Sequence, residues 1–243
     1  MLRPLFAALV TILVTQAAVI TTSVYLHRGL AHRALKLHPV ADFLFRLILW
    51  LFTGQNRRQW VAVHRKHHAF ADREGDPHSP RVHGFWKIQL GNVFYYIREA
   101  RNAETLARWA RDIKDDRWDR LIFNHGNIGG LTGIGLAMLA LGPVWGMAAA
   151  AAHLILYVFL LAPAINGLGH WWGRQNFANN FATNIRVLAW FTGGESLHNN
   201  HHAYPSSPKF SMARFEFDPS WVVIKLLVAV RLVSLVGDKV KLT

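Results

Sequence analysis

Residues 127–166 lie within the longest uncharged stretch of this chain and contain no Asp, Glu, Lys or Arg. A second uncharged stretch covers residues 4–26. A membrane-spanning helix needs roughly 20 apolar residues, so the longer stretch can hold two spans and the other can hold one. Gly142 and Pro143 form the expected turn between the two, because both residue types interrupt helices. The sequence therefore predicts three spans, at about 4–26, 127–144 and 146–166.

Two other structures are compatible with these stretches. A soluble protein can bury an apolar helix, although uncharged stretches of this length are rare in soluble cores. Residues 1–26, with Arg3 as a basic start, also resemble a signal peptide. No polar mature segment follows them, however, because a histidine cluster begins at His27. Membrane spans are therefore the favoured interpretation.

A shorter apolar run, residues 43–52, contains Arg46 and is bounded by polar residues. Roughly ten to fourteen apolar residues suit a helix on the membrane surface better than a span. The stretch from Trp221 to Val236 mixes an apolar face with Lys225 and is expected to form a second interfacial helix. With both helices on the surface, all the histidine motifs described below fall on the same side of the membrane.

The chain carries a formal net charge of +13, and all its Lys and Arg except Arg3 would lie on one side of the membrane. The positive-inside rule makes that side cytoplasmic. A basic face can bind anionic headgroups at roughly 1 kcal/mol per residue, so no nucleic acid is needed to explain the charge. We expect an all-α integral membrane protein of the bacterial inner-membrane kind, one domain over residues 1–243, with interfacial helices and a cytoplasmic helical cap.

Two copies of the pattern H-x-x-H-H occur in the chain, at residues 64–68 and 198–202. Histidines three and four residues apart share one face of a helix, so each triplet is expected to project together. The chain has no cysteine, which removes thiolate ligands, and imidazole suits Zn, Cu, Fe and Ni. With His27 and His32, the candidates exceed the four ligands of one zinc ion. They fit two metal ions, each with four or five nitrogen ligands and an open position.

His27 and His32 lie five residues apart, which is roughly 140° around a regular helix. They cannot both point at one centre unless the helix ends or distorts between them, and Gly29 is expected to allow this. His170 is a ninth candidate at the end of a span. Asn166 lies four residues before it on the same face and could hold a metal-bound water. His153 stands alone within a span and is expected to be a buried, hydrogen-bonded residue.

The motifs HRGLAH, WVAVHRKHH followed by EGDPH, NGLGH, and GGESLHNNHHAYP stand in that order. Over roughly residues 25–240 the chain resembles a membrane fatty-acid desaturase, most closely of the Δ9 acyl-CoA and acyl-lipid branch. The resemblance implies a di-iron centre, with Asn166 acting on it through a water. It assigns the iron to nine histidines: His27, His32, His64, His67, His68, His170, His198, His201 and His202.

The resemblance also implies a reaction. The expected enzyme is an oxidoreductase that uses O2 and two external electrons to place a cis double bond, at Δ9, in a saturated acyl chain carried on CoA or lipid. A related histidine-box hydroxylase, ketolase or alkene-forming decarboxylase is the alternative. A metal-binding or transport protein is a different class, but it would need polar residues inside the spans, where only His153 qualifies.

Further expectations concern partners and neighbouring side chains. No Gly-rich nucleotide motif or fused electron-transfer domain is recognisable, so an external donor such as ferredoxin, or cytochrome b5 with its reductase, is expected to dock on the basic face. Glu195 either orients a ligand imidazole or is an ordinary acid near a helix start. Trp60 and Trp171 either pack beside the metal and acyl tunnel or are interface tryptophans. The family usually has a fourth span before the first motif, so the chain either starts late or has a partner that fills the gap.

Overall fold

The computed structural model describes residues 2–236 and is mostly helical. Residue 1 and residues 237–243, which belong to the predicted single domain, lie outside the described part. The helix α1 (Leu2–Thr21) continues without a break into η1 (Thr22–Ala31). The helix α8 (Pro143–Leu154) continues through η3 (Ile155–Leu161), α9 (Ala162–Asn166) and η4 (Leu168–His170). These two continuous helices, Arg3–Ala31 and Pro143–His170, are long and apolar enough to cross a membrane.

The helix α7 (Gly126–Leu141) forms a hairpin with α8, and the turn lies at the expected place. Gly142 has a φ of 82°, a left-handed conformation that favours glycine, and Pro143 occupies the first helical position. The 16 residues of α7 are fewer than the roughly 20 that an upright span needs. The third membrane span therefore stays a prediction.

The helix α7 packs closely against α2 (Pro39–Phe52). A Cβ atom on Gly126, Gly129 or Gly133 would lie only 2.2 Å from a backbone carbonyl oxygen of the segment 50–54. Glycine is therefore required on this face of α7 because the two backbones touch. The helix α2 includes the apolar run 43–52 and begins a few residues earlier, where Pro39 occupies its first turn and the His38 side chain accepts a hydrogen bond from the Val40 amide.

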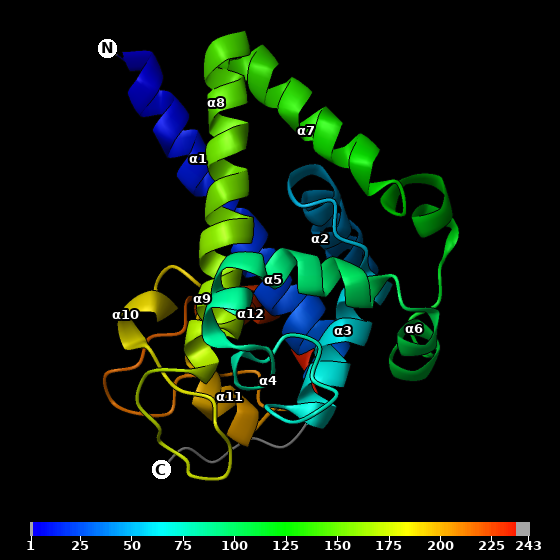
Figure 1. Cartoon of the computed structure of the whole chain (residues 1–243). Coiled ribbons are helices and arrows are strands. Elements are labelled where there is room, and N and C mark those ends of the chain that lie inside the picture. The colour runs from blue at the N-terminus through cyan, green and yellow to red at the C-terminus, as the bar shows by residue number, and fades with distance from the viewer. Residues whose placement is uncertain (1, 237–243) are drawn as a thin grey trace.

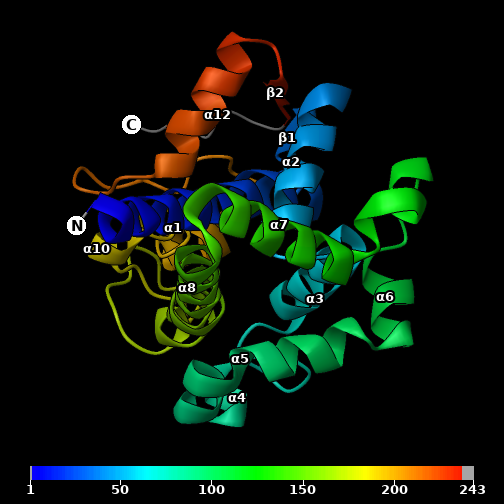
Figure 2. The same cartoon turned by 90° about the horizontal axis from the view of Figure 1, so that it is seen from above.

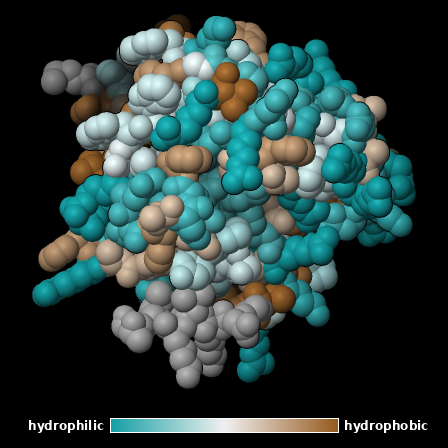
Figure 3. Space-filling model, turned by 60° about the horizontal axis from the view of Figure 1, so that its bottom comes forward, coloured by the Kyte–Doolittle hydropathy of each residue, from teal (hydrophilic) through white to brown (hydrophobic). Residues whose placement is uncertain are grey.

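The remaining helices lie mainly at the end of the molecule opposite to the N-terminus and the α7–α8 turn (Figure 1). Seen from above, α8 is viewed nearly end-on, with α12 (Pro219–Ala229) on one side of α1 and α5 on the other (Figure 2). The surface at this end is mainly hydrophilic (Figure 3). The helices are α3 (Arg57–Phe70), α4 (Pro80–His83), α5 (Phe85–Ala100), α6 (Ala103–Trp109), η2 (Asp119–Phe123), α10 (Arg186–Ala189) and α11 (His198–Ala203).

The prediction of one interfacial helix from Trp221 to Val236 is wrong beyond residue 229. There α12 ends, and Arg231 adopts a left-handed φ of 60°. The strand β2 (Val233–Leu235) then pairs antiparallel with β1 (Leu35–Leu37). Branched apolar residues favour strands, and the ladder satisfies backbone groups that a longer helix would otherwise have paired. This two-stranded sheet ties the C-terminal part of the chain to the segment that follows His32.

Candidate metal centre

The helix that carries the first histidine motif is distorted between His27 and His32. Residues Thr22–Ala31 form a π-helix, and the His32 amide donates to the His27 carbonyl at 3.0 Å. Because π-helical hydrogen bonds join residues five apart, these two histidines lie one turn apart on the same side of the helix. The helix therefore distorts as expected at this motif, and both imidazoles face one centre.

Each H-x-x-H-H triplet is divided between two sites rather than projecting to one. Asn56 caps α3 by accepting from the amides of Arg58 and Gln59, which starts the helix about two turns before its first histidine. Adjacent residues of a helix point roughly 100° apart, so each His-His pair diverges. The helices α3 and α11 consequently each supply histidines to both sites.

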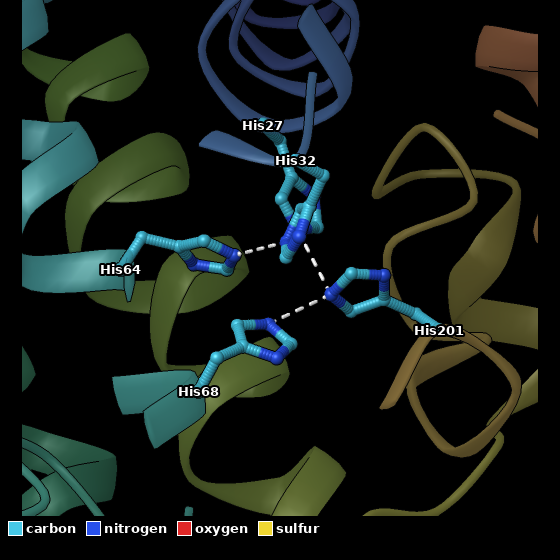
Figure 4. A group of neighbouring side chains, drawn as sticks. All are labelled: His27, His32, His64, His68 and His201. Carbon is cyan, nitrogen blue, oxygen red and sulfur yellow. Dashed lines mark hydrogen bonds between the residues drawn. The ribbon is translucent and has the colours of Figure 1, made fainter. Parts of the chain in front are cut away.

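The first site, cluster one, contains five histidines: His27, His32, His64, His68 and His201. One nitrogen of each lies within 4.8 Å of the others. The Nε2 atom of His201 lies 2.9 Å from that of His68 and 3.0 Å from that of His27. Figure 4 shows the imidazoles from α3, α11 and the end of η1 pointing at one another. Such a convergence of ring nitrogens is the arrangement that a metal ion requires.

The second site, cluster two, contains four histidines: His67, His170, His198 and His202. The Nε2 atom of His202 lies 3.2 Å from that of His198 and 3.4 Å from that of His67. The Nε2 atom of His170 is buried and has no hydrogen-bond partner among the described residues. A buried nitrogen without a partner is costly unless something binds it, so cluster two fits a metal ion.

Three carboxylates bind the Nδ1 atoms of cluster histidines. Glu195 lies 2.5 Å from Nδ1 of His27, Asp76 lies 3.0 Å from Nδ1 of His67, and Asp72 lies 2.7 Å from Nδ1 of His170. A carboxylate on one ring nitrogen fixes the tautomer and turns the other nitrogen toward a metal. Of the three, sequence reasoning named only Glu195 as an orienting residue.

Asp72 and Asp76 lie four and eight residues after the second motif, in the loop that follows α3. Asp76 also organises the loop by accepting from the amides of Asp72 and His78. The signal that could have found both residues is the presence of acids directly after a histidine triplet, because ligand imidazoles generally need such partners.

The electrostatics of the clusters favour neutral imidazoles. Burial, followed by repulsion from neighbouring histidines, holds the pKa values of His64, His68, His198, His201 and His202 well below the usual range. Burial alone would also lower the pKa of His67, but the Asp76 carboxylate raises it. Neutral imidazole is the form that binds metal, so the folded protein holds these side chains ready for ligation.

The other predicted site residues are Trp60, Trp171 and Asn166, and none of them belongs to either cluster. The Trp60 ring stacks on His64 with 4.8 Å between ring centroids. Trp171 is 49% exposed and packs 5.4 Å from Phe85 between ring centroids. Asn166 donates to the side chain of Asn92 at 3.2 Å and belongs to neither cluster. Its action through a water stays a prediction.

Two histidines outside the clusters are buried. His153 bonds to the Thr15 hydroxyl at 3.0 Å and to the Phe52 carbonyl at 2.8 Å, so the expectation of a hydrogen-bonded histidine is confirmed. His78 lies near His67 and Asp76, and both its ring nitrogens lack partners among the described residues.

The fold and the site together define a mostly helical protein with two helices long enough to cross a membrane and two histidine clusters that fit metal ions. The chain matches the Fatty acid desaturase family over residues 3–216, and it belongs to that family. Desaturases are oxidoreductases, the class of enzyme that the sequence predicted.

Three relatives illustrate the similarity. The chain is 33% identical to Delta-9 acyl-lipid desaturase 2 of Arabidopsis thaliana, over 82% of this chain. It is 30% identical to sn-1 stearoyl-lipid 9-desaturase of Synechocystis sp., over 83% of this chain. It is also 30% identical to Acyl-CoA C20 Delta5-desaturase of Anemone leveillei, over 85% of this chain. The chain spans 64%, 62% and 65% of the length of these relatives, respectively.

Proposed function

We propose that this protein is an oxygen-dependent fatty-acyl desaturase that introduces a cis double bond into a saturated acyl chain. The observation that carries this proposal is the division of nine buried or half-buried histidines into two adjacent clusters by α3 and α11. Two metal ions held a short distance apart suit a reaction in which O2 is reduced while two hydrogens leave neighbouring carbons. Family membership supports the same reaction.

The proposed cofactor is a pair of iron ions, one in each cluster. Bound there, iron would supply the activation of O2 that removal of hydrogen from an unactivated methylene requires. The residues of this chain do the remaining work. Glu195, Asp76 and Asp72 hold the protons on Nδ1 of three histidines, which leaves the opposite nitrogens free for iron. Five of the nine histidines are buried and four are half-buried, so most of the metal site is shielded from bulk water.

The proposed substrate is an acyl chain on lipid or CoA, desaturated at Δ9. The names of two relatives specify acyl-lipid or stearoyl-lipid substrates and position 9, whereas others specify acyl-CoA and position 5. The position of the double bond is therefore the finer part of the proposal. We also propose an integral membrane protein with three spans and its metal site on the cytoplasmic face, where an apolar chain could enter from the bilayer.

Product analysis tests the proposal. The chain and a His198→Ala control would be expressed in a host that lacks such an enzyme and contains ferredoxin. Double bonds in the membrane fatty acids would be derivatised and located by gas chromatography with mass spectrometry. A new monoene at Δ9, absent from the control, is the expected result. A monoene at Δ5 or Δ7 would correct the position, and a hydroxy acid or terminal alkene would replace desaturation by one of the related reactions.

A further inference from the structure

A cavity of about 420 Å³ opens from the surface onto the histidine clusters. Its lining includes His32 and His68 from cluster one and His202 from cluster two. Histidines of both clusters are thus reached through a single opening. Around them the wall is made largely of polar side chains, among them Arg65, Asn179 and Asn180.

This lining is unsuited to a saturated acyl chain. Sites for hydrocarbon are lined predominantly by apolar and aromatic side chains, and the only aromatic residue in this wall is Phe181. Burying polar side chains against methylene groups would leave their hydrogen bonds unmade. The opening is therefore a water-filled approach to the histidines, distinct in chemistry from the path that a hydrocarbon would take.

A second cavity of about 440 Å³ adjoins the first, and Arg65 lines both. The Arg65 guanidinium donates to the carbonyl oxygens of Leu30, Ala31 and Trp109 and to the carboxylate of Asp112. It thereby joins the end of the first histidine helix to α6 and holds the wall between the cavities. The outer part of the second cavity is formed by Arg33, Arg108 and Arg111.

The two cavities carry an excess of positive charge. Asp112 is shared between Arg33 and Arg65, and Asp72 binds His170. Among residues 2–236, no ion pair joins Arg73, Arg108 or Arg111 to a carboxylate. All three are exposed. Unpaired arginines around an opening attract an acidic partner from solution.

We propose that these two cavities form the docking surface for an acidic, one-electron donor protein. The proposal rests on the proposed function, because desaturation needs electrons that this chain does not supply. Each turnover breaks two C–H bonds, forms one C=C bond and reduces O2 to two water molecules. The acyl chain gives two electrons and two protons, the donor gives two electrons in single steps, and water supplies two further protons.

The position of the surface suits this role. Electron transfer weakens steeply with distance, and the histidines in the wall of the first cavity are the groups of the metal centre that lie nearest to a protein docked there. The arginines attract the donor, and the first cavity gives the donor its shortest approach to the histidines. The anionic carrier of the substrate is the competing occupant, and the test below separates the two.

The test reverses the charge of two arginines, Arg108 in α6 and Arg111 directly after this helix. The double variant Arg108→Glu/Arg111→Glu would be compared with wild type in lipid nanodiscs, with iron bound. The probe is a plant-type [2Fe–2S] ferredoxin with ferredoxin reductase and NADPH. We expect the Kd and the KM for ferredoxin to rise on the order of tenfold or more at low ionic strength, with kcat at saturating ferredoxin unchanged. The difference should shrink as salt is added.

Two matched variants control the experiment. Arg108→Lys/Arg111→Lys keeps the charge and should keep most of the affinity. Arg214→Glu reverses an exposed arginine outside both cavities and should leave ferredoxin binding unchanged. Because the chain has no cysteine, an Ala107→Cys variant provides one labelling site on α6. A photoactivatable group attached there should cross-link to ferredoxin, and the charge-reversed background should abolish the cross-link.

The outcomes are distinguishable. Unchanged ferredoxin affinity in the charge-reversed variant would overturn the docking surface. A rise in KM for the acyl substrate with ferredoxin affinity intact would overturn it too, and would assign the arginines to the substrate carrier. Absence of any unsaturated product from wild type, with charge-dependent ferredoxin binding intact, would count against desaturation while supporting the surface.

Discussion

His27 and Glu195 form a contact of 2.5 Å between Nδ1 of the imidazole and Oε2 of the carboxylate, although they lie far apart in the sequence. The other carboxylate oxygen accepts from the Ser23 hydroxyl at 2.5 Å, and the Arg28 guanidinium lies 3.7 Å away. With Nδ1 committed to Glu195, the Nε2 atom of His27 faces His201. Glu195 therefore orients a member of cluster one without belonging to it.

Replacing Glu195 by Gln tests this orienting role. Gln keeps the volume but removes the charge and one acceptor oxygen, so we expect metal affinity or activity to fall roughly 10–100-fold. The measurement is iron retained during titration with a chelator, together with product formed. Glu104→Gln, at an exposed position on α6, serves as the control. Equal iron retention in the two variants would show that Glu195 has no effect on the metal site.

One histidine from each cluster tests the assignment of ligands. We expect His64→Ala and His198→Ala each to abolish activity while the protein stays in the membrane, because both clusters are needed for the reaction. Each variant should lose one of two metal ions more readily than the other, measured by metal analysis of purified protein. His125→Ala changes an exposed histidine outside the clusters and should behave as wild type. Wild-type turnover in either cluster variant would remove that histidine from the ligand set.

Removal of metal should expose a dependence of stability on pH. The unfolded chain takes up protons on histidine near pH ~6.5, whereas burial keeps the pKa of His64, His68, His198, His201 and His202 well below that value in the fold. The unfolded state then binds more protons, so stability must fall as the pH drops below about 6.5. His67, whose pKa is raised, opposes this trend but is outnumbered.

Thermal unfolding of metal-free protein in detergent checks the direction of this dependence of stability on pH. The Tm should decrease from about pH 7.5 to about pH 5.5, and a His68→Asn variant should show a shallower decrease. A Tm that rises toward acid would mean that these imidazoles take up protons more readily in the fold than in the unfolded chain.

Two neighbouring glycines of α7 provide a matched test of packing. A Cβ on Gly129 would lie 2.2 Å from the Trp50 carbonyl oxygen, whereas a Cβ on Gly130 would meet nothing within 4 Å. Gly130→Ala should be neutral or stabilising by about 0.5–1 kcal/mol, because Ala loses less backbone entropy in a helix. Gly129→Ala should lower the Tm, because α7 must move away from α2. Equal Tm values for the two variants would contradict the close contact between the helices.

The sequence could predict the parts of the site that follow from local spacing. The H-x-x-H-H pattern, the need for distortion near Gly29 and the turn at Gly142 all depend on residues a few positions apart. The division of the histidines between two clusters could not be read in this way, because it depends on how α3 and α11 face each other. Asp72 was missed for the same reason, since its partner His170 lies on a distant helix.

The stretch after Ala229 shows a second limit of prediction from the sequence. Its apolar residues fit a helix and a strand almost equally well, and pairing with β1 decided between them. Sequence spacing alone contains no information about a partner strand nearly two hundred residues away. The span expected at about 127–144 corresponds to α7, which begins at Gly126 and ends at Leu141, three residues before the predicted end.

The sharing of α3 and α11 between the clusters has a geometric consequence. On α3, His64 and His68 face one cluster and His67 the other, while on α11 His201 faces the first and His198 and His202 the second. The distance between the two sites is therefore set by two helices independently, because within each helix the backbone fixes how far apart its histidines lie. A shift of either helix would move its histidines in both sites together. Small movements of α3 or α11 would therefore leave the spacing between the histidines of that helix unchanged.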